Sequence, residues 1–367
     1  MANKRGRFAP DALLSTALRT LLLLQGLAAV FSFEVYWNIP SFMCNQYGLN
    51  FSNVNRTYSV QQNANDRFRG NAITILYDPG KFPALLEKPS SKTLYKRNGG
   101  VPQEGNLTEH LEVFKRHLDE QVPDKNFSGL GVIDFESWRP IYRQNFASLN
   151  PYKELSMKIE KERNPSWTNV QLEREATRRW EEAGRKYMEQ TLLLAKERRP
   201  LAAWGYYGLP YCFNLNGGPN NQEDCAKDVQ RENDRIMWLF DASDFIYPAV
   251  YLREKLTPQE RQMLIRGRVR ESVRVGKRTA DNRPRKVITY LRYVYIDSLK
   301  LLTESDWINA IEAMKSAGSE GIILWGSSFD LNSKQKCTDF KAYMDNTLGP
   351  ILSSLQPSYT VKNPPKA

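Results

Sequence analysis

Histidine is the scarcest reactive side chain in this 367-residue sequence, which contains only His110 and His117. No H-E-x-x-H motif is present, and this excludes a metalloprotease of that type. No G-x-S-x-G motif is present either, so a Ser-His-Asp triad would have to recruit one of these two residues without a nucleophile elbow. Both histidines fall in a polar segment of helical character (107–121), and we expect both at the protein surface.

Cysteine is also scarce, with four residues in the whole chain. No C-x-x-C pair and no Cys/His cluster occurs, which argues against a zinc site. An even number of cysteines suits an oxidising compartment, and four residues allow three pairings. The short separation between Cys212 and Cys225 favours a local bridge, which leaves Cys44 to pair with Cys337.

A hydrophobic run long enough to cross a membrane is missing, since the apolar segment 20–31 is too short and no later one is longer. That segment follows several basic residues, and Val30 and Ser32 are small enough for a cleavage site. We therefore predict a secretory signal peptide at 1–32, one domain at 33–367 and an extracellular product. Four N-x-S/T sequons fit secretion and are predicted glycosylation sites: Asn50, Asn55, Asn106 and Asn126.

Acidic residues are outnumbered by basic ones, 41 against 52, which gives a formal net charge of +11. Removal of 1–32 would take away four basic residues and one acidic residue, so the remaining chain stays basic. Basic secreted proteins commonly meet anionic polysaccharides or membranes, whereas nucleic acid is a less common partner outside the cell.

The segment 129–136 is a short apolar run that ends in two carboxylates, Asp134 and Glu136. Such a run is typical of a buried strand, and alternation then places both acids on one face, with Cα atoms roughly 6.5–7 Å apart. Two acids that close in a dry cleft cannot easily both ionise, so one is pushed towards its protonated form. A protonated acid beside an ionised one suits glycosidic bond cleavage. The alternative is a solvated strand end with two unrelated acids.

Predicted strands and helices alternate along the chain, about seven times, which is the pattern of a single-domain α/β protein with a distorted (β/α) TIM-like barrel. The predicted strands are 33–39, 72–77, 129–136, 201–207, 245–251, 287–296 and 321–325. The predicted helices are 107–121 with Thr108 as cap, 151–199 with a break at 164–165, one opened by Thr257 and Pro258, one capped by Ser305 or Asp306, and 333–348. The segments 44–69 and 78–105 are expected to be loops.

Acids and aromatic residues gather where these strands end. The residues at these ends are Asp134, Glu136, 204–207, Tyr251, Tyr290 and 325–328. Because the active site of such a barrel lies at the carboxyl ends of its strands, this gathering favours a sugar-binding cleft. The alternative is that tyrosine and tryptophan merely favour strands and strand ends.

Several sequence blocks resemble glycoside hydrolase family 56, the hyaluronidases, and most closely those of insect venom type. The blocks are YWNIPSFMC (36–44), YDPG (77–80) with FPALL (82–86), NGGVPQ (98–103), GVIDFE (131–136), WGYY (204–207) with PYCFN (210–214), and WGSS (325–328). They occur in one order over essentially the whole chain after residue 32.

The resemblance implies an endo-acting enzyme that hydrolyses β-1,4 bonds of hyaluronan with retention of configuration and without a metal or organic cofactor. Its expected partners are hyaluronan and related anionic glycosaminoglycans, and the sequence leaves open whether chondroitin is also cleaved. It implies that Glu136 is the general acid and later the base, and that Asp134 orients the substrate's acetamido group. The nucleophile would be the acetamido oxygen, an exception to the scheme of two enzyme carboxylates. Nucleic acid and membranes are not expected partners, and the sequence leaves the oligomeric state open.

The resemblance also implies a set of substrate-binding residues: Tyr207, Tyr251, Arg268, Tyr290, Trp325 and Ser327. It implies the pairs Cys44–Cys337 and Cys212–Cys225, which agree with the separation argument. Phe329 departs from the polar residue expected after the two serines, which argues against a polar substrate contact there. Two other hypotheses stay open: a family member that binds hyaluronan without cleaving it, and a chitinase-like enzyme acting on neutral polymers.

Overall fold

The computed structural model describes residues 33–88, 91–215 and 221–355. The predicted signal peptide at 1–32 lies outside the described residues and stays a prediction. The described strands are β1 (Glu34–Asn38), β2 (Ile73–Tyr77), β3 (Ala84–Lys88), β4 (Ser91–Arg97), β5 (Leu130–Asp134), β6 (Ala203–Tyr206), β7 (Phe245–Ile246), β8 (Lys286–Arg292) and β9 (Gly321–Trp325). The described α-helices are α2 (Val54–Tyr58), α3 (Leu107–Gln121), α4 (Asn150–Arg163), α5 (Asn169–Arg198), α6 (Lys227–Arg235), α7 (Met237–Ala242), α8 (Pro258–Gly276), α9 (Glu304–Ala317), α10 (Lys334–Tyr343) and α11 (Gly349–Ser354).

Parallel strands form a barrel at the centre of the fold. All the described strands except β3 and β4 belong to it. One sheet has the order β1-β9-β8-β7 and the other β2-β5-β6, with each neighbouring pair parallel. Between β6 and β7 the connection is a single bridge, Tyr207 to Tyr247. Between β1 and β2 a neighbouring segment fills the gap: Gln61 pairs with β1, and the Asn63 side chain bonds the backbone of β2. The predicted seven-stranded, distorted barrel is confirmed.

Alternation along the strands decides which side chains face the barrel interior. The interior cluster takes Ile73 and Ile75 from β2 and Leu130 and Val132 from β5, while Ile133 packs outside against the helices. Side chains two residues apart share a face, so the next inward positions at the carboxyl ends are Tyr77 on β2 and Asp134 on β5. By the same count, Ile288 and Tyr290 face inward on β8, and Ile323 and Trp325 on β9.

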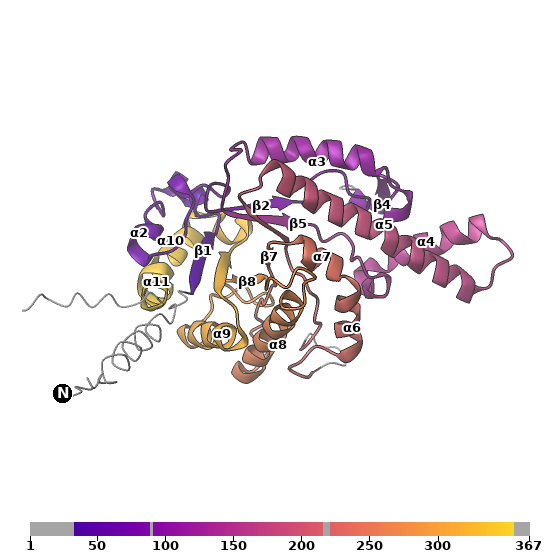
Figure 1. Cartoon of the computed structure of the whole chain (residues 1–367). Helices are drawn as coiled ribbons and strands as arrows, with labels where there is room; N and C mark the ends of the chain where they lie inside the picture. The colour runs from indigo at the N-terminus through magenta and orange to yellow at the C-terminus, as the bar shows by residue number, and fades with distance from the viewer. Residues whose placement is uncertain (1–32, 89–90, 216–220, 356–367) are drawn as a thin grey trace, which may run out of the picture. The chain divides into compact units, whose positions relative to one another are not determined.

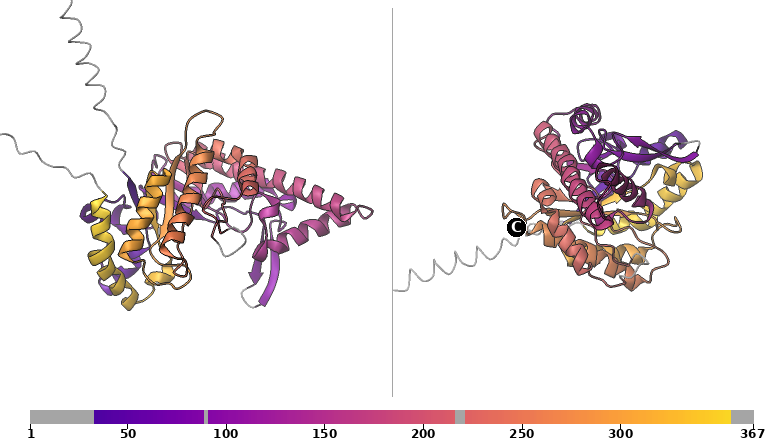
Figure 2. Two further views of the ribbon diagram at one scale, coloured as in Figure 1. Left: turned by 90° about the horizontal axis from the view of Figure 1, so that it is seen from below. Right: turned by 90° about the vertical axis from the view of Figure 1, so that its right-hand side faces the viewer.

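Long helices cover the outside of the barrel. Figure 1 shows α3 and α5 over β2 and β5, and α8 and α9 beside β8 and β9. Two of these helices begin with a capping box, in which Thr168 and Gln171 open α5 and Thr257 and Glu260 open α8. Figure 2 shows the α4–α5 end and the β3–β4 hairpin projecting from the barrel.

The loop predicted at 78–105 is partly wrong, because it contains the antiparallel hairpin of β3 and β4. Its second strand, SKTLYKR, is largely polar and exposed, so it carries no apolar alternation that would have marked a strand. The strand predicted at 245–251 is a regular strand only at Phe245–Ile246 (β7). The strand predicted at 287–296 stops at Arg292 (β8).

Several helix boundaries also differ from the prediction. The cap of α3 is Asn106 rather than Thr108, and the cap of α9 is Thr303 rather than Ser305 or Asp306. In each case the side chain nearest the true start accepts the backbone N–H three residues on. The helix predicted at 333–348 begins after Ser333 but passes through a π-turn at Met344–Leu348 into α11.

The surface position expected for His110 is wrong. Its side chain is buried between α3 and α5, where Nε2 lies 2.7 Å from Thr191 Oγ1 and Nδ1 accepts a hydrogen bond from the Lys81 backbone. Burial, followed by the charge of Arg97, lowers the pKa of His110 to about 3, so the ring is neutral. The polar pattern of the isolated helix could not show that α5 covers it.

Of the two disulfides, one joins an early segment of the chain to a late one and the other closes a loop. Cys44, just after β1, is bonded to Cys337 on α10, and Cys212 is bonded to Cys225 before α6. These are the pairs that the sequence favours. Within the described ranges, no helix is both long and apolar enough to span a bilayer.

Candidate active site

Asp134 and Glu136 lie at the carboxyl end of β5, at the opening of the barrel. Asp134 is the last residue of β5 and pairs in register with Tyr77 of β2. Its side chain is buried, whereas Glu136, two residues further on, is exposed to the opening. Gly131, on the outward face below them, lets the Trp204 ring pack directly on β5, since a Cβ there would lie 2.5 Å from the ring.

The two carboxyl groups share a proton. Burial, the charge of Glu136 and a hydrogen bond to Glu136 together raise the pKa of Asp134 to about 8. Burial also raises the pKa of Glu136, against the hydrogen bond from Asp134 and the charge of Arg139, which lower it. Although Glu136 reaches the opening, the protein around it still limits its hydration. The pair therefore holds one proton near neutral pH, as the spacing of the two acids predicts.

Three tyrosines surround this pair. Tyr207 and Tyr290 meet edge to face with ring centroids 5.0 Å apart, and the Tyr251 hydroxyl donates a hydrogen bond to that of Tyr207. Burial raises the pKa of each of the three, so all remain neutral hydroxyls. The buried Tyr290 hydroxyl makes no hydrogen bond to another residue of the described chain, which leaves it available to a molecule in the opening.

Trp325 closes the opposite side of the opening. Its ring stacks on Tyr251 at a centroid distance of 5.7 Å, and its Nε1 donates a 2.8 Å hydrogen bond to the Tyr77 hydroxyl. Sequence reasoning missed Tyr77, although it ends a predicted strand and faces inward beside Asp134. Its strand-end position was the signal that could have found it.

Ser327 lies at the rim, where Trp325 and Ser327 line two hollows of about 340 and 780 Å³. The smaller is also lined by Phe42, Phe68, Arg69 and Tyr77. Ser327 caps the turn η6 (Ser328–Leu331), so its hydroxyl accepts from the Phe329 backbone. The Phe329 ring itself is 74% exposed.

Three arginines differ in their surroundings: Arg139, Arg143 and the predicted substrate-binding residue Arg268. Arg268 on α8 bonds Asn214 Oδ1 and the Ala249 carbonyl, and burial lowers its pKa to about 10, against the charge of Tyr207. These bonds hold the Arg268 guanidinium where the charge of Tyr207 acts on it, and its role in substrate binding stays a prediction. Arg143 pairs with Glu232 and Asp228. Arg139 alone of these packs among aromatic rings beside Glu136.

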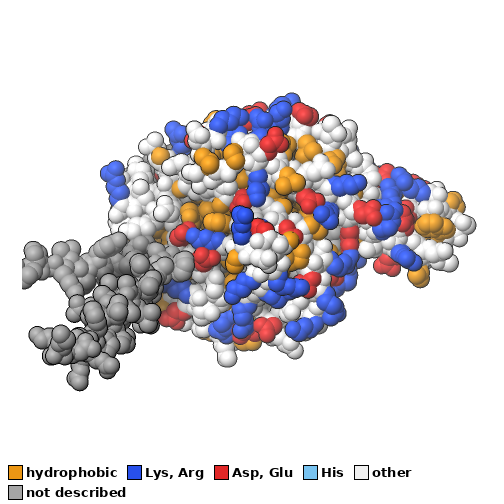
Figure 3. Space-filling view, in the orientation of Figure 1, with side chains coloured by type: hydrophobic (Ala, Val, Ile, Leu, Met, Phe, Trp, Pro, Cys, Tyr) orange, Lys and Arg blue, Asp and Glu red, His pale blue; other side chains and the backbone are white. Residues whose placement is uncertain are grey.

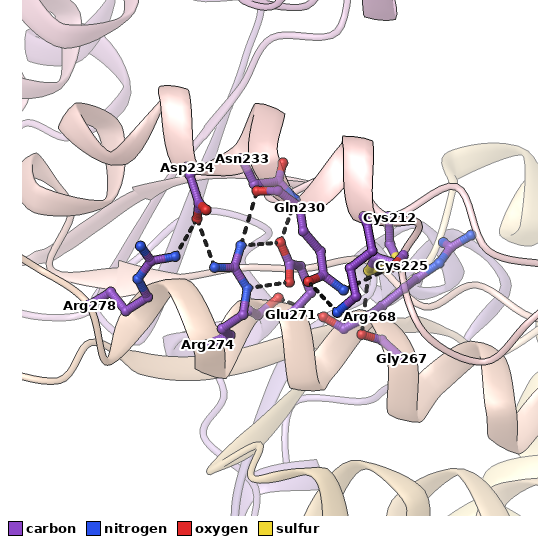
Figure 4. Close-up of polar contacts among 12 residues, drawn as sticks. Cys212, Cys225, Gln230, Asn233, Asp234, Gly267, Arg268, Glu271, Arg274 and Arg278 are labelled. Atoms are coloured by element: carbon purple, nitrogen blue, oxygen red, sulfur yellow. Dashed lines mark hydrogen bonds and ion pairs between the residues drawn. A yellow bond between two sulfur atoms is a disulfide. The ribbon is translucent and has the colours of Figure 1, made fainter.

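A polar network between α6 and α8 fixes the wall that carries Tyr211. The Asn233 amide donates to the Tyr211 carbonyl and to Glu271, and Glu271 also accepts two 2.7 Å bonds from Arg274 (Figure 4). Arg274 and Arg278 both reach Asp234. The network joins α6 and α8 through paired charges, of which Glu271 is buried and the others are partly exposed.

The remaining predicted sites lie on the surface. All four sequon asparagines are exposed, and Asn106 also caps α3 through its side-chain oxygen. Over the part of the chain that the structure describes, no group of three acidic, histidine or cysteine side chains is arranged to hold a metal ion. Figure 3 shows basic and acidic side chains interspersed over the face in view, so the excess positive charge does not form one patch there.

Comparison with known proteins places this geometry in a family. The profile of the family described as hyaluronidase matches residues 25–360. A hyaluronidase of Apis mellifera is 49% identical over 325 residues, which is 88% of this chain and 84% of the relative. Hyaluronidase B of Vespa velutina is 47% identical over 87% of this chain and 95% of its own length.

Solved structures agree. The crystal structure of bee venom hyaluronidase in complex with a hyaluronic acid tetramer has a TM-score of 0.85 and 48% identity, and covers 88% of this chain and 99% of the other. A monoclinic crystal form of bee venom hyaluronidase gives a TM-score of 0.83. A profile match over most of the chain and relatives at this identity leave one conclusion: the chain belongs to the hyaluronidase family, glycoside hydrolase family 56.

Proposed function

We propose that this protein is a secreted enzyme that hydrolyses the β-1,4 bonds of hyaluronan within the polymer, with retention of configuration. The observation that carries the proposal is the Asp134–Glu136 pair at the carboxyl end of β5, where the two carboxyl groups interact directly and burial raises the pKa of both. Family membership supports the reaction, and the relative solved with a hyaluronic acid tetramer supports the substrate. The aromatic residues around the pair supply surfaces on which sugar rings stack.

The chemistry follows from the different positions of the two carboxyl groups. Asp134 is buried, so an acetamido N–H that approaches it favours its ionised form, and the shared proton passes to the exposed Glu136. The acetamido oxygen of the substrate attacks the anomeric carbon as the bond to the leaving sugar breaks, and Glu136 gives its proton to the leaving oxygen. A cyclic oxazolinium ion results, whose positive charge lies beside ionised Asp134.

The second half of the reaction restores the enzyme. Glu136, now ionised, removes a proton from water as the water oxygen attacks the anomeric carbon and the oxazolinium ring opens. Two displacements at the same carbon retain its configuration. The neutral hydroxyls of Tyr207, Tyr251 and Tyr290 can donate hydrogen bonds to the sugar and its acetamido group throughout.

Glu136→Gln tests the proposal. The variant keeps the size of the side chain but cannot carry the proton, so we expect kcat to fall by about 10²–10⁴-fold while hyaluronan still binds. Release of reducing ends measures turnover, and retention on immobilised hyaluronan measures binding. Glu312→Gln makes the same change on the exposed face of α9 and should leave both unchanged. Turnover by Glu136→Gln close to that of the unchanged protein would overturn the assignment, and absence of turnover in the unchanged protein would favour a binding protein instead.

A further inference from the structure

An aromatic cage encloses Arg139 next to the carboxyl pair. The guanidinium carbon lies 4.8 Å from the ring centre of Phe146, 4.9 Å from that of Tyr211 and 5.0 Å from that of Phe213. The Tyr211 and Phe213 rings are stacked at 5.3 Å, and Phe146 meets Phe213 edge to face at the same distance. Cation–π contacts of this kind hold a planar guanidinium at a fixed place.

The backbone around the cage is firmly held. Asn145 accepts from the Arg139 N–H at 2.9 Å and donates to the Arg139 carbonyl at 3.0 Å. On the other wall, Asn233 bonds the Tyr211 carbonyl, and the Cys212–Cys225 disulfide follows directly. Such fixation is typical of a preorganised binding surface rather than of a solvated arginine.

Arg139 has no ion-pair partner among the described residues, although its charge acts on nearby Glu136. Throughout the described ranges, no carboxylate forms an ion pair with Arg139, whereas Arg143 and Arg179 each pair with two acids. The Arg139 guanidinium donates to the Gln144 carbonyl and to the Tyr211 hydroxyl, which are neutral acceptors and leave some of its five N–H groups unused. The cage is half-buried, and the Phe146 ring is 41% exposed, so a ligand can reach it.

The cage lies on the Glu136 side of the carboxyl pair. The charge of Arg139 acts on Glu136, whereas the charges that act on Asp134 are those of Glu136 and Asp78. The hollow beside Trp325 and Tyr77 lies at the ends of β9 and β2, on the Asp134 side. In the proposed reaction Asp134 holds the acetamido group of the sugar that is attacked, and Glu136 protonates the sugar that leaves. The cage therefore faces the leaving half of the polymer.

We propose that Arg139, Phe146, Tyr211 and Phe213 form the binding site for the leaving-group side of the chain, in which the Arg139 guanidinium binds a hexuronate carboxylate and the exposed aromatic rings pack on a sugar face. The inference rests on the proposed function and adds to it the part of the substrate that these residues recognise. A guanidinium among aromatic rings suits a carboxylate on a sugar ring, because it offers charge, parallel donors and an apolar surface together.

Two substrates distinguish binding of the leaving-group side from a general effect on catalysis or folding. The first is hyaluronan, whose leaving group carries hexuronates. The second is a hyaluronan oligosaccharide with a 4-nitrophenyl group on its reducing end, whose released aryl group carries no carboxylate and is too small to span the cage. For Arg139→Gln we expect kcat/KM on hyaluronan to fall by about 10–100-fold, the size of a charge-assisted contact, and kcat/KM on the aryl glycoside to change by less than about threefold.

Equal losses on both substrates, or no loss on hyaluronan, would overturn the proposal, since an effect through folding acts on both. A shift of the pH profile on hyaluronan in Arg139→Gln would also overturn it, because the nitrophenyl group leaves with little need of protonation and cannot report an effect through Glu136. Phe146→Leu changes only the exposed ring and should raise KM for hyaluronan alone, which keeps the test open if Arg139→Gln folds poorly. Arg185→Gln is the matched control, because Arg185 lies over the Trp238 ring at 5.5 Å on the outer surface. Failure of the unchanged protein on both substrates would instead refute the proposed function.

Discussion

Two buried acids in this protein, Asp134 and Glu271, have opposite surroundings. Asp134 and Glu271 are similarly buried, 9% and 3% exposed. Glu271 accepts hydrogen bonds from Arg274 and Asn233, and its neighbour Asp234 accepts from Arg274 and Arg278 (Figure 4). Asp134 has another carboxyl group as its hydrogen-bond partner, and within the described chain no lysine or arginine pairs with it.

The pKa values follow this difference. Burial alone would raise the pKa of Asp234, but the bonds from Arg274 and Arg278 lower it below the ordinary value. For Asp134 burial and the neighbouring acid act in the same direction, and the pKa rises to about 8. At the partly exposed Asp234 cation pairing thus favours the anion, whereas at Asp134 burial and the neighbouring acid favour the protonated form. The same residue type is structural in one region and reactive in the other.

Glu271→Ala gives the largest effect that this comparison predicts. Truncation leaves Arg274 and the Asn233 amide without their main acceptor between α6 and α8. Breaking a buried ion pair commonly costs about 3–5 kcal/mol, and the partial exposure of Arg274 favours the lower end, about 3 kcal/mol. Urea unfolding followed by circular dichroism measures the loss.

Glu312→Ala serves as its control, since it removes the same side chain from an exposed position of α9. We expect a change within about 0.5 kcal/mol for that variant. A similar loss for both variants, or a negligible loss for Glu271→Ala, would show that the α6–α8 network does not stabilise the fold and would remove one side of the comparison.

Asp134→Asn is expected to stabilise the fold, whereas Glu271→Ala destabilises it, and its effect is smaller. The Asp134 carboxyl keeps its proton to about pH 8 in the folded protein, whereas in the unfolded chain it loses it near pH 4. Between these values the unfolded state binds fewer protons, so folding stability falls as the pH rises. A neutral amide avoids this cost. One pKa unit corresponds to about 1.4 kcal/mol, and we expect the variant to be more stable than the unchanged protein by about 1–2 kcal/mol at pH 8, despite losing its activity.

The pH dependence identifies the cause of this gain. Unfolding free energies at pH 4 and pH 8 should show the advantage of Asp134→Asn growing across that window and then levelling off. Asp339→Asn on the exposed face of α10 should show no such trend. An advantage that is equal at both pH values would mean that the amide improves packing and that ionisation of Asp134 is not what costs stability.

Sequence alone placed the carboxyl pair because a strand's two-residue period is a local property. Asp134, Tyr290 and Trp325 follow from this period once the strands are known, and so does Tyr77, which was overlooked. The barrel follows from the alternation of strands with helices. Where the period is weak, as in the polar strand β4, the prediction failed.

Features that depend on contacts between distant segments could not be predicted. His110 looks like a surface residue until α5 packs over α3 and Thr191 reaches its ring. The cage around Arg139 joins residues that follow β5 to residues that follow β6, and Phe213 adopts a positive φ of 57° within it. Irregular loops have no period, so their side chains come together only through tertiary packing.

The smallest predicted effect tests whether pairing or burial matters in the comparison. Arg178 on α5 bonds Glu175 and Glu182, so it has as many acidic partners as Arg274, but it lies on the exposed helix surface. Water already solvates these charges, so the pairs should add little. We expect the melting temperature of Arg178→Ala to match that of the unchanged protein, and added salt to change neither. A drop as large as that of Glu271→Ala would show that the number of ion pairs, rather than their burial, determines how acids stabilise this fold.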